Sequence, residues 1–90
     1  MIGQTINNYL LERKLGEGGM SEVFLARHNR IDRVVAIKVL HKNLFTNELV
    51  RNRFKNEANA LIKLEHPNIV KIYDYIEQKD FACLIVEFID

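Results

Sequence analysis

The chain has 90 residues, which is enough for one small domain and no more. Hydrophobic residues make up 48% and charged residues 28%, a balance typical of a folded globular domain rather than a disordered segment. Lys and Arg number 13 against 12 Asp and Glu, and this near-neutral charge argues against a nucleic-acid-binding protein, which usually has a clear basic excess.

The first third of the chain has the pattern of a β-hairpin. Residues 9–15 and 22–27 favour strands, and the short segment between them contains three of the four glycines. Residues 1–8 precede this pattern and are interpreted as an N-terminal extension. Residues 33–40 are rich in β-branched side chains and follow a turn, so they predict a third strand.

The hydrophobic period changes in the middle of the chain. Between about residue 48 and residue 65 the apolar side chains recur at spacings of three and four, as in an amphipathic helix; they are Val50, Phe54, Ala58, Leu61 and Leu64. Thr46 or Asn47 would cap this helix, and Pro67 would end it by disfavouring helical backbone at the preceding residue.

Two further strands are predicted near the end of the chain. Residues 70–77 and 81–88 have strand character and flank a short polar turn. The order of elements is therefore three strands, one helix and two strands. This order predicts an α+β fold, a five-stranded antiparallel sheet with one packed helix.

The glycine cluster is the first candidate for binding chemistry. Gly16, Gly18 and Gly19 lie where a loop must bend and where backbone N–H groups could approach an anion. On its own, such a stretch is more often a flexible hairpin turn. A Walker loop would need Gly-Lys-Ser/Thr, which is absent, and a dinucleotide fold would need the loop to open a helix rather than a strand.

Two charged residues interrupt apolar patterns. Lys38 lies inside a β-branched strand, where Ala36 and Lys38 share one face and Ile37 shares the other with Val39. Glu57 lies within the apolar stripe of the helix. Each alone is most simply an exposed charge, but a cation and an anion placed in buried surroundings favour pairing with each other.

Taken in order, these features resemble the protein kinase family. The resemblance begins at Tyr9, runs through the Gly-rich hairpin, Val35-Ala36-Ile37-Lys38 and Glu57, and continues through His66-Pro67-Asn68-Ile69-Val70 to Val86-Glu87-Phe88-Ile89-Asp90. The Gly-Gly-Met sequence is most similar to bacterial Ser/Thr kinases of the eukaryotic-like class. The resemblance implies that residues 9–90 form the ATP-binding small lobe, ending at the hinge between lobes.

The resemblance also implies roles for individual residues. Those covering the ATP phosphates through backbone N–H groups would be Gly16, Glu17, Gly18, Gly19, Met20 and Ser21. Those around the adenine would be Leu15, Val23 and Ala36, with Val86 as gatekeeper and with backbone groups of Glu87 and Ile89 bonding the base. Lys38 would hold the α- and β-phosphates, and Glu57 would pair with Lys38 when the helix is swung in. Leu61 and Ile72 would join the hydrophobic column toward the other lobe.

The pattern departs from the family in two ways. Ser21 replaces the third loop glycine, and its hydroxyl could itself donate to a phosphate. The His-Arg-Asp catalytic loop and the Asp-Phe-Gly metal site do not occur in these residues, so no metal ligand is expected among them and Mg²⁺ would be held by the absent large lobe.

The resulting expectation is a Ser/Thr kinase as the parent protein, which transfers the ATP γ-phosphate to Ser/Thr hydroxyls of protein substrates. The 90 residues alone are expected to be inactive and to self-associate through surface that the large lobe would cover. The alternative is a pseudokinase-like module that binds nucleotide or a partner without transfer, and a plain structural domain is the third interpretation. We expect a cytoplasmic location, with a membrane span beyond these residues left open.

Overall fold

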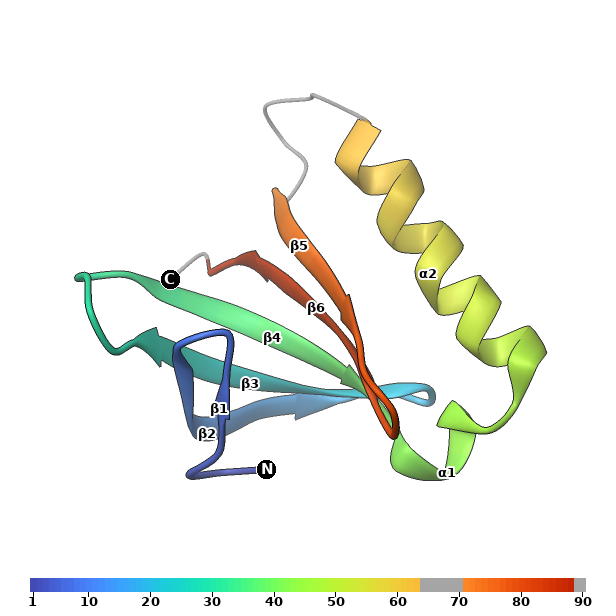
Figure 1. Ribbon diagram of the computed structural model, residues 1–90, viewed down its shortest axis with the longest axis horizontal. Coiled ribbons are helices and arrows are strands. Elements are labelled where there is room, and N and C mark those ends of the chain that lie inside the picture. Colours follow the sequence, from blue (N-terminus) through green and yellow to red (C-terminus); the bar gives the residue numbers. More distant parts are fainter. Residues whose placement is uncertain (64–70, 89–90) are drawn as a thin grey trace.

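The computed structural model describes residues 1–63 and 71–88, except for the side chains of residues 60–63. The strands are β1 (Thr5–Ile6), β2 (Tyr9–Glu17), β3 (Ser21–His28), β4 (Val34–Leu40), β5 (Ile72–Glu77) and β6 (Ala82–Glu87), and the helices are α1 (Lys42–Phe45) and α2 (Glu48–Lys63). The strands form one antiparallel sheet in the order β1-β2-β3-β4-β6-β5, and α2 lies beside the β5 edge (Figure 1). The predicted α+β fold is confirmed.

The sheet has one strand more than the sequence predicted. Residues 1–8 were interpreted as an extension, but Thr5–Ile6 pairs with β2 through the register Ile6↔Tyr9. Asn7 and Asn8 form the two-residue connection with φ of 48° and 70°. Positive φ at both central residues is the geometry of a type I′ hairpin, which Asn tolerates well. A two-residue strand is too short to show alternation of apolar and polar side chains. The Asn-Asn pair was the one sequence feature that indicated the hairpin.

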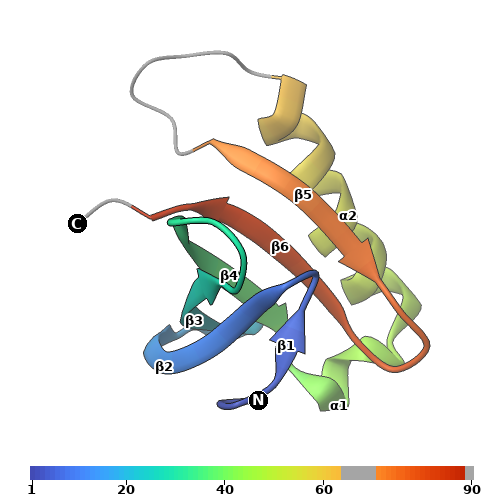
Figure 2. The ribbon, with the colours of Figure 1, turned by 60° about the vertical axis from the view of Figure 1, so that its left-hand side comes forward.

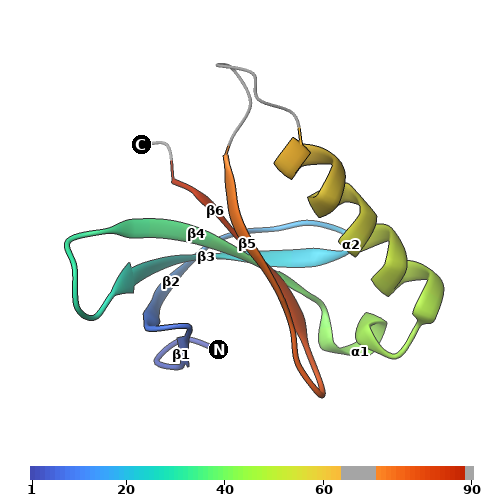
Figure 3. The same ribbon diagram turned by 45° about the horizontal axis from the view of Figure 1, so that its top comes forward.

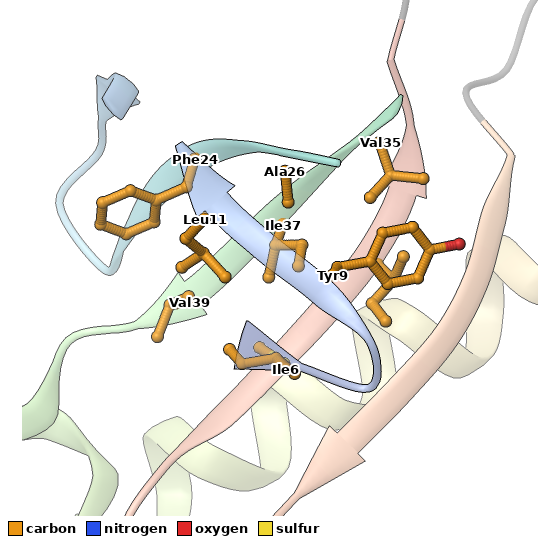
Figure 4. Packing of buried hydrophobic residues seen from close by; sticks show 10 residues of the cluster. Ile6, Tyr9, Leu11, Phe24, Ala26, Val35, Ile37 and Val39 are labelled. Carbon is orange, nitrogen blue, oxygen red and sulfur yellow. The ribbon is translucent and has the colours of Figure 1, made fainter. Parts of the chain in front are cut away.

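The sheet is strongly curled. Register shifts in β2 fall between Leu11 and Arg13 and between Lys14 and Gly16. Such bulges bend a strand and increase its twist. The curl brings β1 and β2 over one face (Figure 2), where they close a core of buried apolar residues (Figure 4), which includes Ile6, Leu11, Phe24, Val35, Ile37 and Val39.

A second apolar cluster joins α2 to the other face of the sheet. Its buried members are Leu40, Phe54, Ala58, Ile72, Ala82 and Leu84. The helix is capped by Asn47, whose Oδ1 accepts a hydrogen bond from the Val50 N–H at 3.2 Å. The predicted helix end at Pro67 lies outside the described residues. No helix in the described part of the chain is long and apolar enough to cross a bilayer.

Candidate functional site

Lys38 lies on the face of the sheet that α2 covers. Directly opposed residues of antiparallel strands share a face, and the register places Lys38 opposite Val23 of β3 and Leu84 of β6. Leu84 in turn lies opposite Tyr75 of β5 and belongs to the cluster under α2. The predicted alternation is confirmed, because Val35, Ile37 and Val39 all point into the opposite core.

The Gly-rich hairpin joins the same row. Gly16 of β2 lies opposite Val23, so one row runs from Gly16 through Val23 to Lys38. Three neighbouring strands span about 10 Å at 4.8 Å per spacing. The two segments expected to meet phosphates are thus held at a fixed separation on one face by backbone pairing, which does not depend on side-chain rotamers.

A second row provides two of the residues expected around the adenine, and others lie beside it. Ala36 lies opposite Leu25 on one side and Val86 on the other. Ala36 is 7% exposed, whereas Val23 and Val86 are half-buried. Leu15, also half-buried, lies in the second bulge of β2. This arrangement places four of the predicted adenine residues on or beside one sheet face; Ile89 lies outside the described residues.

The ion pair between Lys38 and Glu57 is not formed. No salt bridge joins these two residues, both of which are described, and Glu57 is exposed. The helix face that meets the sheet is centred between Phe54 and Ala58, roughly 80° around the axis from Glu57 at 3.6 residues per turn. Glu57 is therefore exposed in this structure, and its pairing with Lys38, expected when the helix is swung in, stays a prediction.

The position of α2 explains the separation. The helix packs against β5 and α1, along the edge of the sheet (Figure 3). Lys38 is on β4, and β6 intervenes between β4 and β5, so the two strands are about 10 Å apart. Pairing with Lys38 would require α2 both to roll and to move toward β4.

The loop tip is closed by the chain itself. The Gly18 N–H donates to the Ser21 carbonyl at 2.7 Å. Ser21 is 3% exposed and pairs with Leu40, so it lies at the base of the tip. A Cβ added at Gly16 or Gly19 would meet nothing within 4 Å, and at Gly18 it would meet only the Ser21 carbonyl at 3.8 Å. The fold therefore makes no steric demand for glycine at these three positions, and the missing side chains leave the backbone of the tip uncovered.

A charged cluster lies at the base of this loop. Lys14 Nζ donates to Glu17 Oε1 at 2.8 Å and to Glu22 Oε1 at 3.2 Å. These bonds raise the pKa of Lys14, chiefly through Glu17, and the Lys14 bond lowers the pKa of Glu17. Ligand atoms of Glu17, Glu22 and His41 lie within 4.8 Å of one another, but the Lys14 ammonium already supplies the positive charge between the carboxylates.

The last described residues complete the site at the end of β6. Glu87 pairs with Val35, and its backbone N–H donates to the Lys71 carbonyl at 2.8 Å. That N–H is thus occupied, which leaves the carbonyl as the group of Glu87 expected to bond a base.

Met20 is directed away from the tip, since it packs against the cluster under α2. The sequence pattern did not indicate His41, because this residue reaches the loop only in the folded chain.

Comparison with known proteins agrees with this geometry. The family described as "Protein kinase domain" matches residues 9–90. The chain is 47% identical over 78 residues to serine/threonine-protein kinase pkn2 of Myxococcus xanthus, covering 87% of this chain and 9% of that protein. It is 41% identical over 92 residues to serine/threonine-protein kinase PrkC of Bacillus subtilis, covering 100% of this chain and 14% of that protein.

A solved structure gives the same result for the fold. The kinase domain of Mycobacterium tuberculosis PknI superimposes with a TM-score of 0.78 at 29% identity, covering 100% of this chain and 36% of that one. The chain therefore spans about a third of that solved kinase domain, and a smaller share of the two curated relatives.

Proposed function

This chain belongs to the protein kinase family, and we propose that residues 9–90 are the ATP-binding small lobe of a Ser/Thr kinase that transfers the γ-phosphate of ATP to protein hydroxyls. One observation supports the proposal above the others: the row Gly16–Val23–Lys38 aligns the Gly-rich hairpin and Lys38 on one sheet face. Proteins and ATP are the substrates under this proposal, and a cytoplasmic location is part of it.

Each proposed role follows from what a residue offers. The backbone N–H groups between Gly16 and Ser21 would donate to phosphate oxygens, and the missing side chains let the backbone approach closely. The Lys38 ammonium would offset the charge of the α- and β-phosphates. Val23, Ala36 and Val86 would supply apolar surface on one sheet face, against which the adenine would be shielded from water.

The groups for phosphoryl transfer itself are not proposed for this chain. An Asp that accepts the hydroxyl proton and the Asp and Asn that hold Mg²⁺ would come from the large lobe. Glu57 would pair with Lys38 after α2 rolls and moves inward, and that pairing would fix the Lys38 side chain on the phosphates. Without that pairing, the Lys38 side chain would lack this orientation.

The second candidate is a module that binds nucleotide without transferring phosphate. The exposed position of Glu57 supports it, because a Lys38 side chain that Glu57 does not pair with is less well oriented. A Glu57→Gln substitution in the parent protein distinguishes the two candidates. In an active kinase it would abolish γ-phosphate transfer. In a non-catalytic module it would leave the nucleotide affinity unchanged.

Calorimetric titration of the 90-residue chain with ATP tests the proposed site. We expect a dissociation constant weaker than about 1 μM, since half of the adenine contacts and the Mg²⁺ ligands would belong to the large lobe. Lys38→Met should weaken ATP binding further. The matched control is Lys79→Met, which removes an exposed ammonium from the distant β5–β6 turn. Equal affinity for the two variants would refute the role of Lys38.

A further inference from the structure

His41 contacts both sides of the Gly-rich loop from outside it. It follows the last residue of β4, and its backbone N–H donates to the Met20 carbonyl at 3.0 Å. Its ring Nε2 lies 3.1 Å from the Gly18 carbonyl. A carbonyl only accepts hydrogen bonds, so this contact requires a proton on Nε2. One residue thus ties two carbonyls of the tip to the end of β4.

These ties add to the other restraints on the tip, which include the packing of Met20 against the cluster under α2. Within the tip, the Gly18 N–H bond to the Ser21 carbonyl closes the turn. Glycine loses more conformational freedom on ordering than any other residue, and Gly18 and Gly19 are adjacent here. A loop ordered before a ligand arrives pays less of this entropy when the ligand binds.

The charges around His41 make its position relevant to an anion. Glu17 and Glu22 each place a carboxylate within 4.8 Å of a His41 ring nitrogen, at the base of the loop. Two carboxylates would repel a triphosphate, and the hydrogen bonds from Lys14 offset their charge. The imidazole adds an N–H donor on the same side and directs it to Gly18.

We propose that His41 is a positioning residue for the phosphate-covering loop: it holds the Gly18 and Met20 carbonyls so that the loop N–H groups are ordered for a nucleoside triphosphate. The inference rests on the proposed nucleotide site. It predicts an effect on the phosphates and not on the base, because the hydrogen bond of the His41 ring is made to the loop tip.

The test compares ATP with adenosine in NMR titrations of the full 90-residue chain. His41→Ala should weaken ATP binding about three- to tenfold, the loss expected for one hydrogen bond, and leave adenosine binding unchanged. His41→Gln retains a side-chain N–H donor and should restore most of the ATP affinity. The matched control is His28→Ala, which removes an imidazole that accepts from the Arg30 and Ile31 N–H groups in the distant β3–β4 turn.

A second measurement separates loop order from ligand affinity. In the ligand-free chain, ¹⁵N relaxation should show lower order parameters at Gly18 and Gly19 in His41→Ala than in His28→Ala. This comparison remains valid even if the His41 substitution lowers the overall stability. Equal loss of ATP and adenosine binding in His41→Ala, or unchanged order of the two glycines, would overturn the role of His41. If the unsubstituted chain bound neither ATP nor adenosine, the nucleotide site itself would be refuted and the inference with it. If it bound both, and His41→Ala bound each with the same affinity as the unsubstituted chain, the inference alone would be refuted.

Discussion

Phe54 anchors α2 to the sheet, and its replacement by Ala tests this packing. The Phe54 side chain is 0% exposed, and its ring centroid lies 6.2 Å from that of Tyr75 on β5. Removing a buried Phe side chain costs about 3–5 kcal/mol through lost transfer energy and the cavity that remains. A domain of 90 residues has a free energy of unfolding of about 5–13 kcal/mol at 0.05–0.15 kcal/mol per residue. Phe54→Ala should therefore remove about a quarter or more of the stability.

Urea unfolding followed by far-ultraviolet circular dichroism measures the effect. With a denaturant slope of about 1.5 kcal/mol per molar, the loss corresponds to a midpoint lowered by about 2 M or more. Leu49→Ala is the matched control on the same helix: Leu49 is 81% exposed, and its loss should change the free energy of unfolding by less than about 0.5 kcal/mol. If Phe54→Ala were no more destabilising than Leu49→Ala, α2 would not pack on the sheet in the way described.

Three further outcomes are expected. The isolated chain should transfer no labelled γ-phosphate to a generic protein substrate above a Lys38→Met control, and incorporation above that control would contradict the assignment of transfer groups to the large lobe. Burial raises the pKa of the Cys83 thiol from 9.0 to about 12. The thiol therefore loses its proton at lower pH in the unfolded chain than in the folded one, and the free energy of unfolding should fall as pH rises from 9 to about 12. Cys83→Ala should flatten this dependence when unfolding is measured across that pH range. Leu15, Val23 and Val86 remain half-buried on or beside the face that carries Ala36 and Lys38, so sedimentation should show self-association with rising concentration, and a single monomer at high micromolar concentration would contradict it.

The strand alternation could be predicted from the sequence because it depends on local geometry. Side chains point to opposite faces with a period of two, so Ala36 and Lys38 had to share a face once the strand was identified. The structure confirms that face and shows that α2 covers it. The same local rule does not identify a strand as short as Thr5–Ile6. This strand pairs with β2 because Asn7 and Asn8 accept the positive φ of the connecting turn.

The helix shows why the site could be predicted only in part. The sequence defines an apolar stripe on α2, but it does not specify over which strand the stripe lies. Because Phe54 and Ala58 pack beside β5, Glu57 lies at the exposed side, away from Lys38. His41 is a similar case: its contacts with Gly18 and Met20 join segments more than twenty residues apart, and no local pattern indicates them.

Amide chemical-shift mapping with ATP would locate the proposed nucleotide site on the sheet. Isotope-labelled chain titrated with ATP should show shift changes at the loop glycines, at Lys38 and at Glu87, which lie on the α2-covered face or at the end of β6. The turn at residues 29–33 and the β1 hairpin should remain unchanged. Shift changes confined to that turn or to β1 would contradict the account and place any nucleotide site elsewhere on the lobe.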